Sequence, residues 1–92
     1  MATLVVDHHL KDFDSWFDTF KGDPPPNIGQ WRVARGTDDP NRVHVIGVID
    51  DSEVDAVKEF LNSEHMQNVF ARVNANSTQP IEFIWFEDVT PG

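Results

Sequence analysis

The chain turns from strand to helix within residues 8–16, which read His8-His9-Leu10-Lys11-Asp12-Phe13-Asp14-Ser15-Trp16. Upstream, side chains alternate across an extended segment, and one face of it carries Leu4, Val6, His8 and Leu10. Downstream, helical spacing gathers a stripe of Phe13, Trp16, Phe17 and Phe20. Asp12 is well placed as the N-cap of that helix. The sequence therefore predicts a first strand ending near residue 10 and a first helix beginning near residue 13.

The composition is that of a small globular protein. The 92 residues include 39% hydrophobic and 11% aromatic residues, which predicts one domain over residues 1–92. Sixteen acidic against seven basic residues give a net charge of -9, which disfavours nucleic acid and anionic membrane surfaces as partners. There is no Cys, no signal-peptide-like segment and no run long enough to span a bilayer. A cytoplasmic protein is the expectation.

The remaining segments predict a hairpin of two strands, a broken helix, a last strand and the turns and loops that connect them. Residues 30–35 and 42–50 read as two strands of a hairpin, and the second is apolar on both faces, as expected of a central strand. Two helical stripes, at residues 54–61 and 66–73, face opposite sides and predict a break at Asn62-Ser63. The spacing Ser52-Glu53-Val54-Asp55 predicts a capping box. Residues 21–26 read as a connecting loop, and residues 81–89 as a last strand.

The resulting order βαββαβ predicts an α+β, ferredoxin-like fold. Such a fold has a four-stranded antiparallel or mixed sheet in the order 4-1-3-2, with the helices on one face. We expect the first and third strands to run parallel, which separates His8 from His44 by roughly 13 Å along the sheet. The second face of the sheet is apolar on at least three strands, so a partner sheet is expected to cover it. The sequence thus predicts a homodimer.

Several of these segments resemble a known family. Residues 8–16 resemble the H-x-V-x-D-Y-D-x-W start of many small dimeric α+β-barrel proteins, residues 38–45 are similar to their hairpin, and the broken second helix is also like theirs. The likeness extends from the first strand through Asp88. These proteins are grouped with the antibiotic-biosynthesis monooxygenase-like superfamily, which also holds haem-degrading enzymes, polyketide cyclases, small isomerases and members without assigned activity. No residues match the Asn, Trp and His set of the haem-degrading branch.

The resemblance implies a dimeric α+β barrel that binds a small hydrophobic or aromatic molecule. It leaves two functional hypotheses open. One is a cofactor-independent monooxygenase, or a cyclase- or isomerase-like enzyme, acting on a small aromatic or polyketide-like substrate. The other is a non-catalytic dimer that binds a ligand or only assembles. An open pocket beside His8 favours the first, and a pocket filled by the aromatic side chains of the first helix favours the second.

The candidate catalytic residue is His8, because it shares a face with apolar residues. A buried imidazole stays neutral near pH 7 and can abstract a proton from an acidic phenol or enol. The alternative is a hydrogen-bonded structural histidine. The predicted strand order brings His8, Trp31, Asp50 and Glu82 to one rim. The candidate ligand-binding residues are Trp16, Trp31, Asp50 and Glu82. For the tryptophans, the alternative is core filling.

No metal site and no cofactor are expected from these residues. Adjacent His8 and His9 point to opposite faces of a strand, and His44 is expected to lie too far from His8, whereas metal sites need three or four convergent ligands. A substrate carbanion formed by proton abstraction can react with oxygen directly. That scheme requires no flavin, haem or metal.

Overall fold

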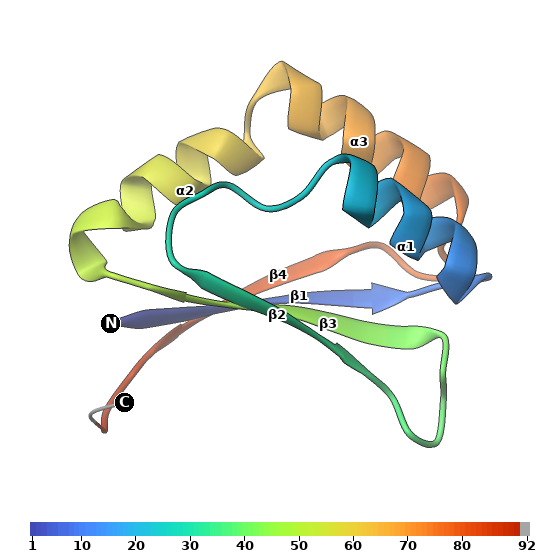
Figure 1. Ribbon diagram of the computed structural model, residues 1–92, viewed down its shortest axis with the longest axis horizontal. Coiled ribbons are helices and arrows are strands. Elements are labelled where there is room, and N and C mark those ends of the chain that lie inside the picture. The colour runs from blue at the N-terminus through green and yellow to red at the C-terminus, as the bar shows by residue number, and fades with distance from the viewer. Residues whose placement is uncertain (91–92) are drawn as a thin grey trace.

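A computed structural model describes residues 1–90 of the chain. Its elements are, in order, β1 (Ala2–His9), α1 (Phe13–Gly22), β2 (Gln30–Arg35), β3 (Arg42–Ile49), the 3₁₀ turn η1 (Asp51–Glu53), α2 (Val54–Leu61), α3 (Glu64–Ala75) and β4 (Glu82–Glu87). All the helices lie over one face of a four-stranded sheet (Figure 1). The predicted α+β, ferredoxin-like fold is confirmed. No helix in this part of the chain is both long and apolar enough to cross a membrane.

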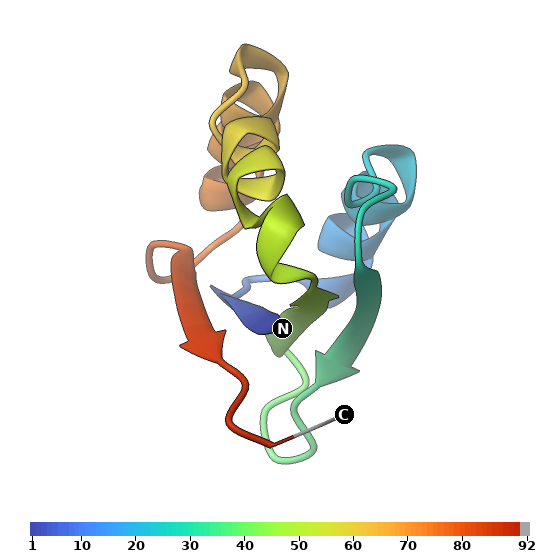
Figure 2. The same cartoon turned by 90° about the vertical axis from the view of Figure 1, so that its left-hand side faces the viewer.

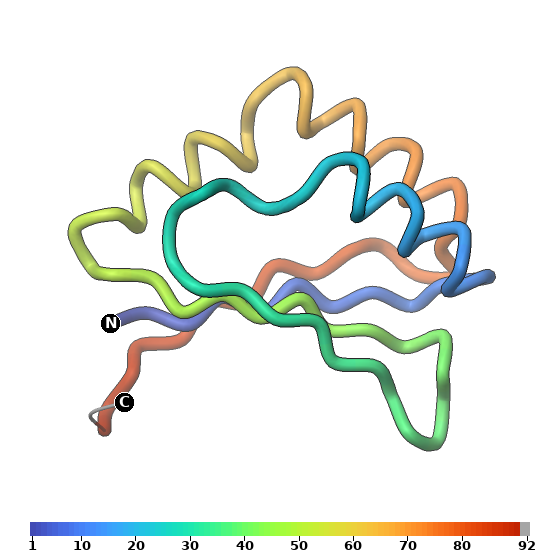
Figure 3. Tube along the Cα trace, in the orientation of Figure 1, coloured from blue at the N-terminus to red at the C-terminus, as the bar shows by residue number. Residues whose placement is uncertain are grey.

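The sheet has the order β2-β3-β1-β4, which is the predicted 4-1-3-2 order read from the other edge. Every neighbouring pair is antiparallel. The expected parallel pairing of the first and third strands is therefore wrong, because Asp7 pairs with His44 and His8 with Val43. Figure 3 shows the reason: the chain returns over the sheet between α1 and β2, so that β2 starts at the end where β1 started, and the hairpin then reverses β3.

The core lies between the sheet and the two groups of helices. Seen from the side, α1 covers the β2 side of the sheet while α2 and α3 cover the β4 side (Figure 2). The predicted inner face of β1 is buried, and its members are Leu4, Val6, His8 and Leu10. Each fully buried aliphatic side chain stabilises the fold by about 1.5–3 kcal/mol relative to its exposed state. This inner face positions His8 beneath α1.

The helix boundaries follow local side-chain chemistry. The Asp12 carboxylate accepts a hydrogen bond from the Ser15 amide, as expected of the predicted N-cap of α1. The predicted break is confirmed, with the Ser63 hydroxyl accepting from the Met66 amide at the start of α3. The predicted capping box is wrong. Here Asp50 accepts from the amide and the hydroxyl of Ser52, because a 3₁₀ turn precedes α2 and places Ser52 inside it.

The sheet face away from the helices is apolar at its centre. Alternation along the strands puts Val5, Ile46 and Ile84 on this outer face, since Val5 pairs with Ile46 on one side and with Ile84 on the other. Ile84 is 36% exposed, and Phe86, on the same face, is 52% exposed. A contiguous apolar face of this kind is typical of an interaction surface.

Candidate functional site

A cavity of about 70 Å³ lies between the sheet and the helices. One water molecule needs about 10–15 Å³ by this measure, so the cavity has room for about five or six heavy atoms, the size of one small ring. Its walls are almost entirely apolar and come from every strand and from all three α-helices. The lining residues include His8, Trp16, Phe20, Trp31, Leu61, Phe70 and Phe83.

His8 is the buried polar group of this cavity. Its side chain is only 4% exposed, and its Nδ1 atom is buried without a hydrogen-bond partner among residues 1–90. Burial is the main cause that lowers the pKa of His8 to about 4, although the nearby Asp7 carboxylate opposes the shift. The imidazole is therefore neutral at pH 7. An unpaired buried polar atom is costly, so a ligand hydroxyl or carbonyl that satisfied it would bind favourably.

Aromatic rings form the wall next to His8. The Trp16 ring lies 5.1 Å from the His8 ring, centroid to centroid, and 5.2 Å from the Phe20 ring. Trp31 reaches the cavity from β2, and its indole N–H donates to the Ile28 carbonyl at 2.8 Å, which fixes the ring. Flat aromatic walls favour a flat ligand through dispersion and edge-to-face contacts.

The position of α1 over the cavity is set by two asparagines. The Asn41 side-chain oxygen accepts from the Phe13 amide at 3.2 Å. The Asn76 side chain accepts from the Asp12 amide and donates to the Asp12 carbonyl. The bonds from the Asp12 and Phe13 amides satisfy N–H groups at the helix start, which have no partner within the helix. The start of α1 is thereby tied to the β2–β3 hairpin and to the end of α3.

The loop after α1 forms another wall. Asp23, Pro25 and Pro26 all line the cavity. The Asp23 carboxylate contacts His65 Nε2 at 2.9 Å and Arg72 Nη2 at 3.1 Å, which ties the loop to α3. The sequence predicted only a connector here, because a proline run shows that a helix ends but does not show which surface the loop covers.

The structure brings together three of the five predicted site residues. His8, Trp16 and Trp31 line the cavity, whereas Asp50 and Glu82 do not. Asp50 is exposed and caps η1, and Glu82 is exposed on the outer face opposite Asp7. The predicted common rim does not form, because in the antiparallel sheet β1 ends at the opposite end from β3. The ligand-binding and catalytic roles of all five stay predictions.

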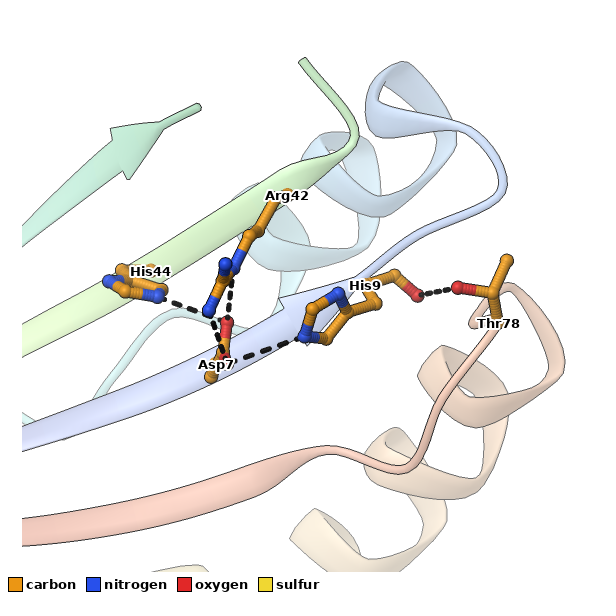
Figure 4. Close-up of polar contacts among 5 residues, drawn as sticks. All are labelled: Asp7, His9, Arg42, His44 and Thr78. Carbon is orange, nitrogen blue, oxygen red and sulfur yellow. Dashed lines mark hydrogen bonds and ion pairs between the residues drawn. The ribbon is translucent and has the colours of Figure 1, made fainter. Parts of the chain in front are cut away.

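A cluster of charged and titratable groups on the outer face was not predicted (Figure 4). Asp7 is 5% exposed and contacts three side chains: His44 Nε2 at 3.0 Å, Arg42 Nη2 at 3.3 Å and His9 Nε2 at 3.4 Å. Burial acts to raise the pKa of Asp7, but the hydrogen bond and charge of Arg42, helped by His44 and His9, lower it below its ordinary value. The antiparallel register, which pairs Asp7 with His44, is the signal that would have revealed this cluster.

The described part of the chain has no cluster of side chains arranged as metal ligands. Within residues 1–90, no group of three or more histidine, aspartate or glutamate side chains is arranged to hold a metal ion. Within the cavity, His8 and Asp23 are the two titratable side chains among the lining residues. The arrangement offers one neutral imidazole in an apolar pocket, which suits hydrogen bonding to a ligand or proton exchange with it.

The fold is similar to that of the ferredoxin-like α+β domains in antibiotic biosynthesis monooxygenase structures. SnoaB, a cofactor-independent oxygenase from Streptomyces nogalater, superposes with a TM-score of 0.78 and 19% identity over 98% of this chain and 94% of that chain. A structure described as antibiotic biosynthesis monooxygenase superposes with a TM-score of 0.75 and 16% sequence identity, over 98% of this chain and 100% of that chain. An uncharacterized NIPSNAP domain protein from Burkholderia xenovorans superposes with a TM-score of 0.74 and 14% sequence identity, over 100% of both chains.

At these identities the likeness shows the fold, in agreement with the resemblance found in the sequence. No protein-family model matches the chain, and no curated protein matches it in sequence.

Proposed function

We propose that this protein binds a small aromatic or polyketide-like molecule in the cavity beside His8 and acts on it as a cofactor-independent monooxygenase. The observation that carries the proposal is the buried, neutral imidazole of His8, whose Nδ1 lacks a partner in an otherwise apolar, aromatic cavity. The fold shared with a cofactor-independent oxygenase supports the reaction class.

In the proposed reaction, His8 takes a proton from an acidic phenol or enol of the substrate. A low pKa keeps the imidazole lone pair free at pH 7 but makes His8 a weak base. The anion formed beside it offsets this weakness, because an opposite charge at short range stabilises the imidazolium. The substrate carbanion then gives its electron pair to dioxygen, which forms a C–O bond, and the imidazolium returns the proton to give a hydroperoxide. Loss of water from the hydroperoxide breaks the O–O bond and a C–H bond at the same carbon, so that one oxygen atom ends in the product as a carbonyl and the other in water.

Oxygen uptake tests the proposal. A panel of phenols and enolisable aromatic ketones is supplied to the protein, and substrate-dependent oxygen consumption is measured. We expect His8→Phe, which keeps an aromatic ring at the position, to lower turnover by about 10²-fold or more, the usual contribution of a general base. Glu59→Gln, at an exposed residue of α2 that does not line the cavity, is the control and is expected to keep full activity. Equal turnover of His8→Phe and the wild type would refute the catalytic role.

A second candidate is a non-catalytic protein that binds a small ligand. The small cavity volume, and the absence of any polar lining group beside His8 other than Thr19 and Asp23, favour it. It predicts ligand binding at His8 without oxygen uptake for any member of the panel.

We further propose that the functional unit is a homodimer. The support is the apolar outer face around Val5, Ile46 and Ile84, which a second sheet would cover. A dimer formed in this way leaves the cavity free, because the cavity lies on the opposite side of the sheet.

A further inference from the structure

Two hollows of this protein share one wall. Besides the cavity at His8, a hollow of about 390 Å³ lies between the helices α2 and α3 and the edge strand β4. Leu61, Phe70 and Phe83 line both. The two spaces are therefore separated by a partition of side chains, which we call the Phe70–Phe83 partition.

The partition is made of side chains that can move without moving the backbone. The rings of Phe70 and Phe83 meet edge to face, with centroids 5.2 Å apart and planes at 69°. Phe83 lies on the edge strand and is 40% exposed, so its ring is not held on all sides. Exposed side chains change rotamer within nanoseconds. Rotation of these two rings would join the hollows.

The outer hollow is lined by both polar and apolar side chains. Ile81 and Trp85 are among the apolar ones, and Asn62, Gln67 and Asn74 contribute amide groups. Lys58 also lines it, with Nζ 5.3 Å from the centroid of the Trp85 ring. In a chain of net charge -9, this ammonium forms no ion pair with any carboxylate of residues 1–90. A ligand carboxylate would supply one.

We propose that the two hollows form a single binding site, divided in the free protein by the Phe70–Phe83 partition. The site takes an elongated, flat molecule whose hydroxyl or carbonyl group lies beside His8 and whose carboxylate lies at Lys58. The inner cavity alone holds about one small ring, so a ligand of two or more rings that enters it can extend past the partition into the outer hollow. This inference rests on the proposed function in one respect, that the inner cavity accepts a ring.

Three tryptophans report on the two hollows separately. The indole N–H signals of Trp16 and Trp31 belong to the inner cavity, and that of Trp85 belongs to the outer hollow. Heteronuclear NMR spectra are recorded with phenol, a one-ring probe, and with 6-hydroxy-2-naphthoate, which carries a hydroxyl at one end and a carboxylate at the other. Phenol is expected to shift the Trp16 and Trp31 signals. The naphthoate is expected to shift all three and to displace phenol.

The two probes separate the two ideas. If neither probe shifts the Trp16 and Trp31 signals, the inner cavity accepts no ring, and the proposed function is overturned together with the joined site. A naphthoate that shifts only Trp85, or that binds together with phenol, overturns the joined site while leaving the inner cavity as a ring-binding pocket.

Variants test the partition and the charge. Phe83→Ala should raise the association rate constant of the naphthoate by about two- to tenfold, the equivalent of one aromatic contact. Phe86→Ala is the matched control, because Phe86 lies on the same strand but lines neither hollow, and it should leave the rate unchanged. Lys58→Met should lower the affinity for the naphthoate by about two- to fivefold, as expected for the loss of a partly exposed ion pair. The affinity for 2-naphthol, which has no carboxylate, should stay unchanged. Equal rates for Phe83→Ala and the wild type would refute the partition, and unchanged naphthoate affinity in Lys58→Met would refute the assigned carboxylate position.

Discussion

The ring of Trp31 lies directly against Gly47 of the neighbouring strand, so closely that a Cβ on Gly47 would stand 2.6 Å from the indole. The two residues are cross-strand partners on the face of the sheet that lines the cavity. Because the Trp31 indole N–H is bonded to the Ile28 carbonyl, the ring is tied and cannot move freely aside. A glycine in a central strand thus makes room for one wall of the cavity.

Gly47→Ala should therefore displace Trp31. We expect the free energy of unfolding to fall by about 1–3 kcal/mol, as for other overpacked sites, and the Trp31 indole signal to shift. Urea unfolding and NMR measure the two effects. Gly22→Ala is the control, because no atom lies within 4 Å of a Cβ placed there, and its stability should equal or slightly exceed that of the wild type. Equal stability of both variants would contradict the close contact.

His8 should make stability depend on pH. Its pKa is about 4 in the folded protein and roughly 6.5 in an unfolded chain. Between these values the unfolded chain binds a proton that the folded protein does not, so the free energy of unfolding falls as the pH is lowered, by up to about 3 kcal/mol. Urea unfolding at fixed protein concentration, between about pH 7 and pH 4, measures the slope. His8→Phe should have a shallower slope than the wild type. An unchanged slope in His8→Phe would show that the imidazole titrates equally in both states.

Asp7→Asn should destabilise the outer-face cluster. The substitution removes the charge that Arg42, His44 and His9 share, and we expect a loss of about 1–2 kcal/mol near pH 7, moderated by the exposure of Arg42. Since the pKa of Asp7 is lowered in the folded state, its contribution is present above the ordinary carboxylate range and is lost as the pH falls through the folded-state pKa. Glu82→Gln, at the paired position on β4, is the control and should change stability by less than about 0.5 kcal/mol. If Asp7→Asn and Glu82→Gln lowered the free energy of unfolding equally, the cluster would make no particular contribution to stability.

The outer face should support a dimer. Light scattering at micromolar concentration is expected to give roughly twice the chain mass of 10.5 kDa. Ile84→Lys places a charge on this face and should yield the monomer. Val89→Lys, at a 91% exposed apolar residue after β4, should leave the dimer intact. A monomeric wild type would remove the basis for this prediction.

A chelator should leave the melting temperature unchanged. The prediction rests on the placement of the histidines within residues 1–90. His8 faces the cavity, and His9 and His44, which both contact Asp7 on the other face, do not form a group with it that could hold a metal ion. Loss of a structural metal usually costs a protein its fold. A large fall in melting temperature after treatment with a chelator would contradict this reading of the histidines.

Much of the fold was predictable because it is encoded locally. The alternation that buries Leu4 and Val6, the Asp12 cap and the break before Ser63 each depend on a few neighbouring residues. The order of strands then follows from general rules of connection. The inner position of His8 follows from the same alternation and needs no long-range information.

The site itself depends on which distant segments meet, and here local patterns carry no signal. The relative direction of β1 and β3 depends on the path of the chain between α1 and β2. The parallel direction expected from the sequence was wrong, and so was the common rim predicted from it for His8, Trp31, Asp50 and Glu82. The chain by itself determined the elements and the buried face of β1, because those are set by side-chain periodicity. Only the tertiary structure decided that Asp7 meets His44, that prolines line the cavity and that Phe70 meets Phe83, since each depends on packing between residues far apart in the chain.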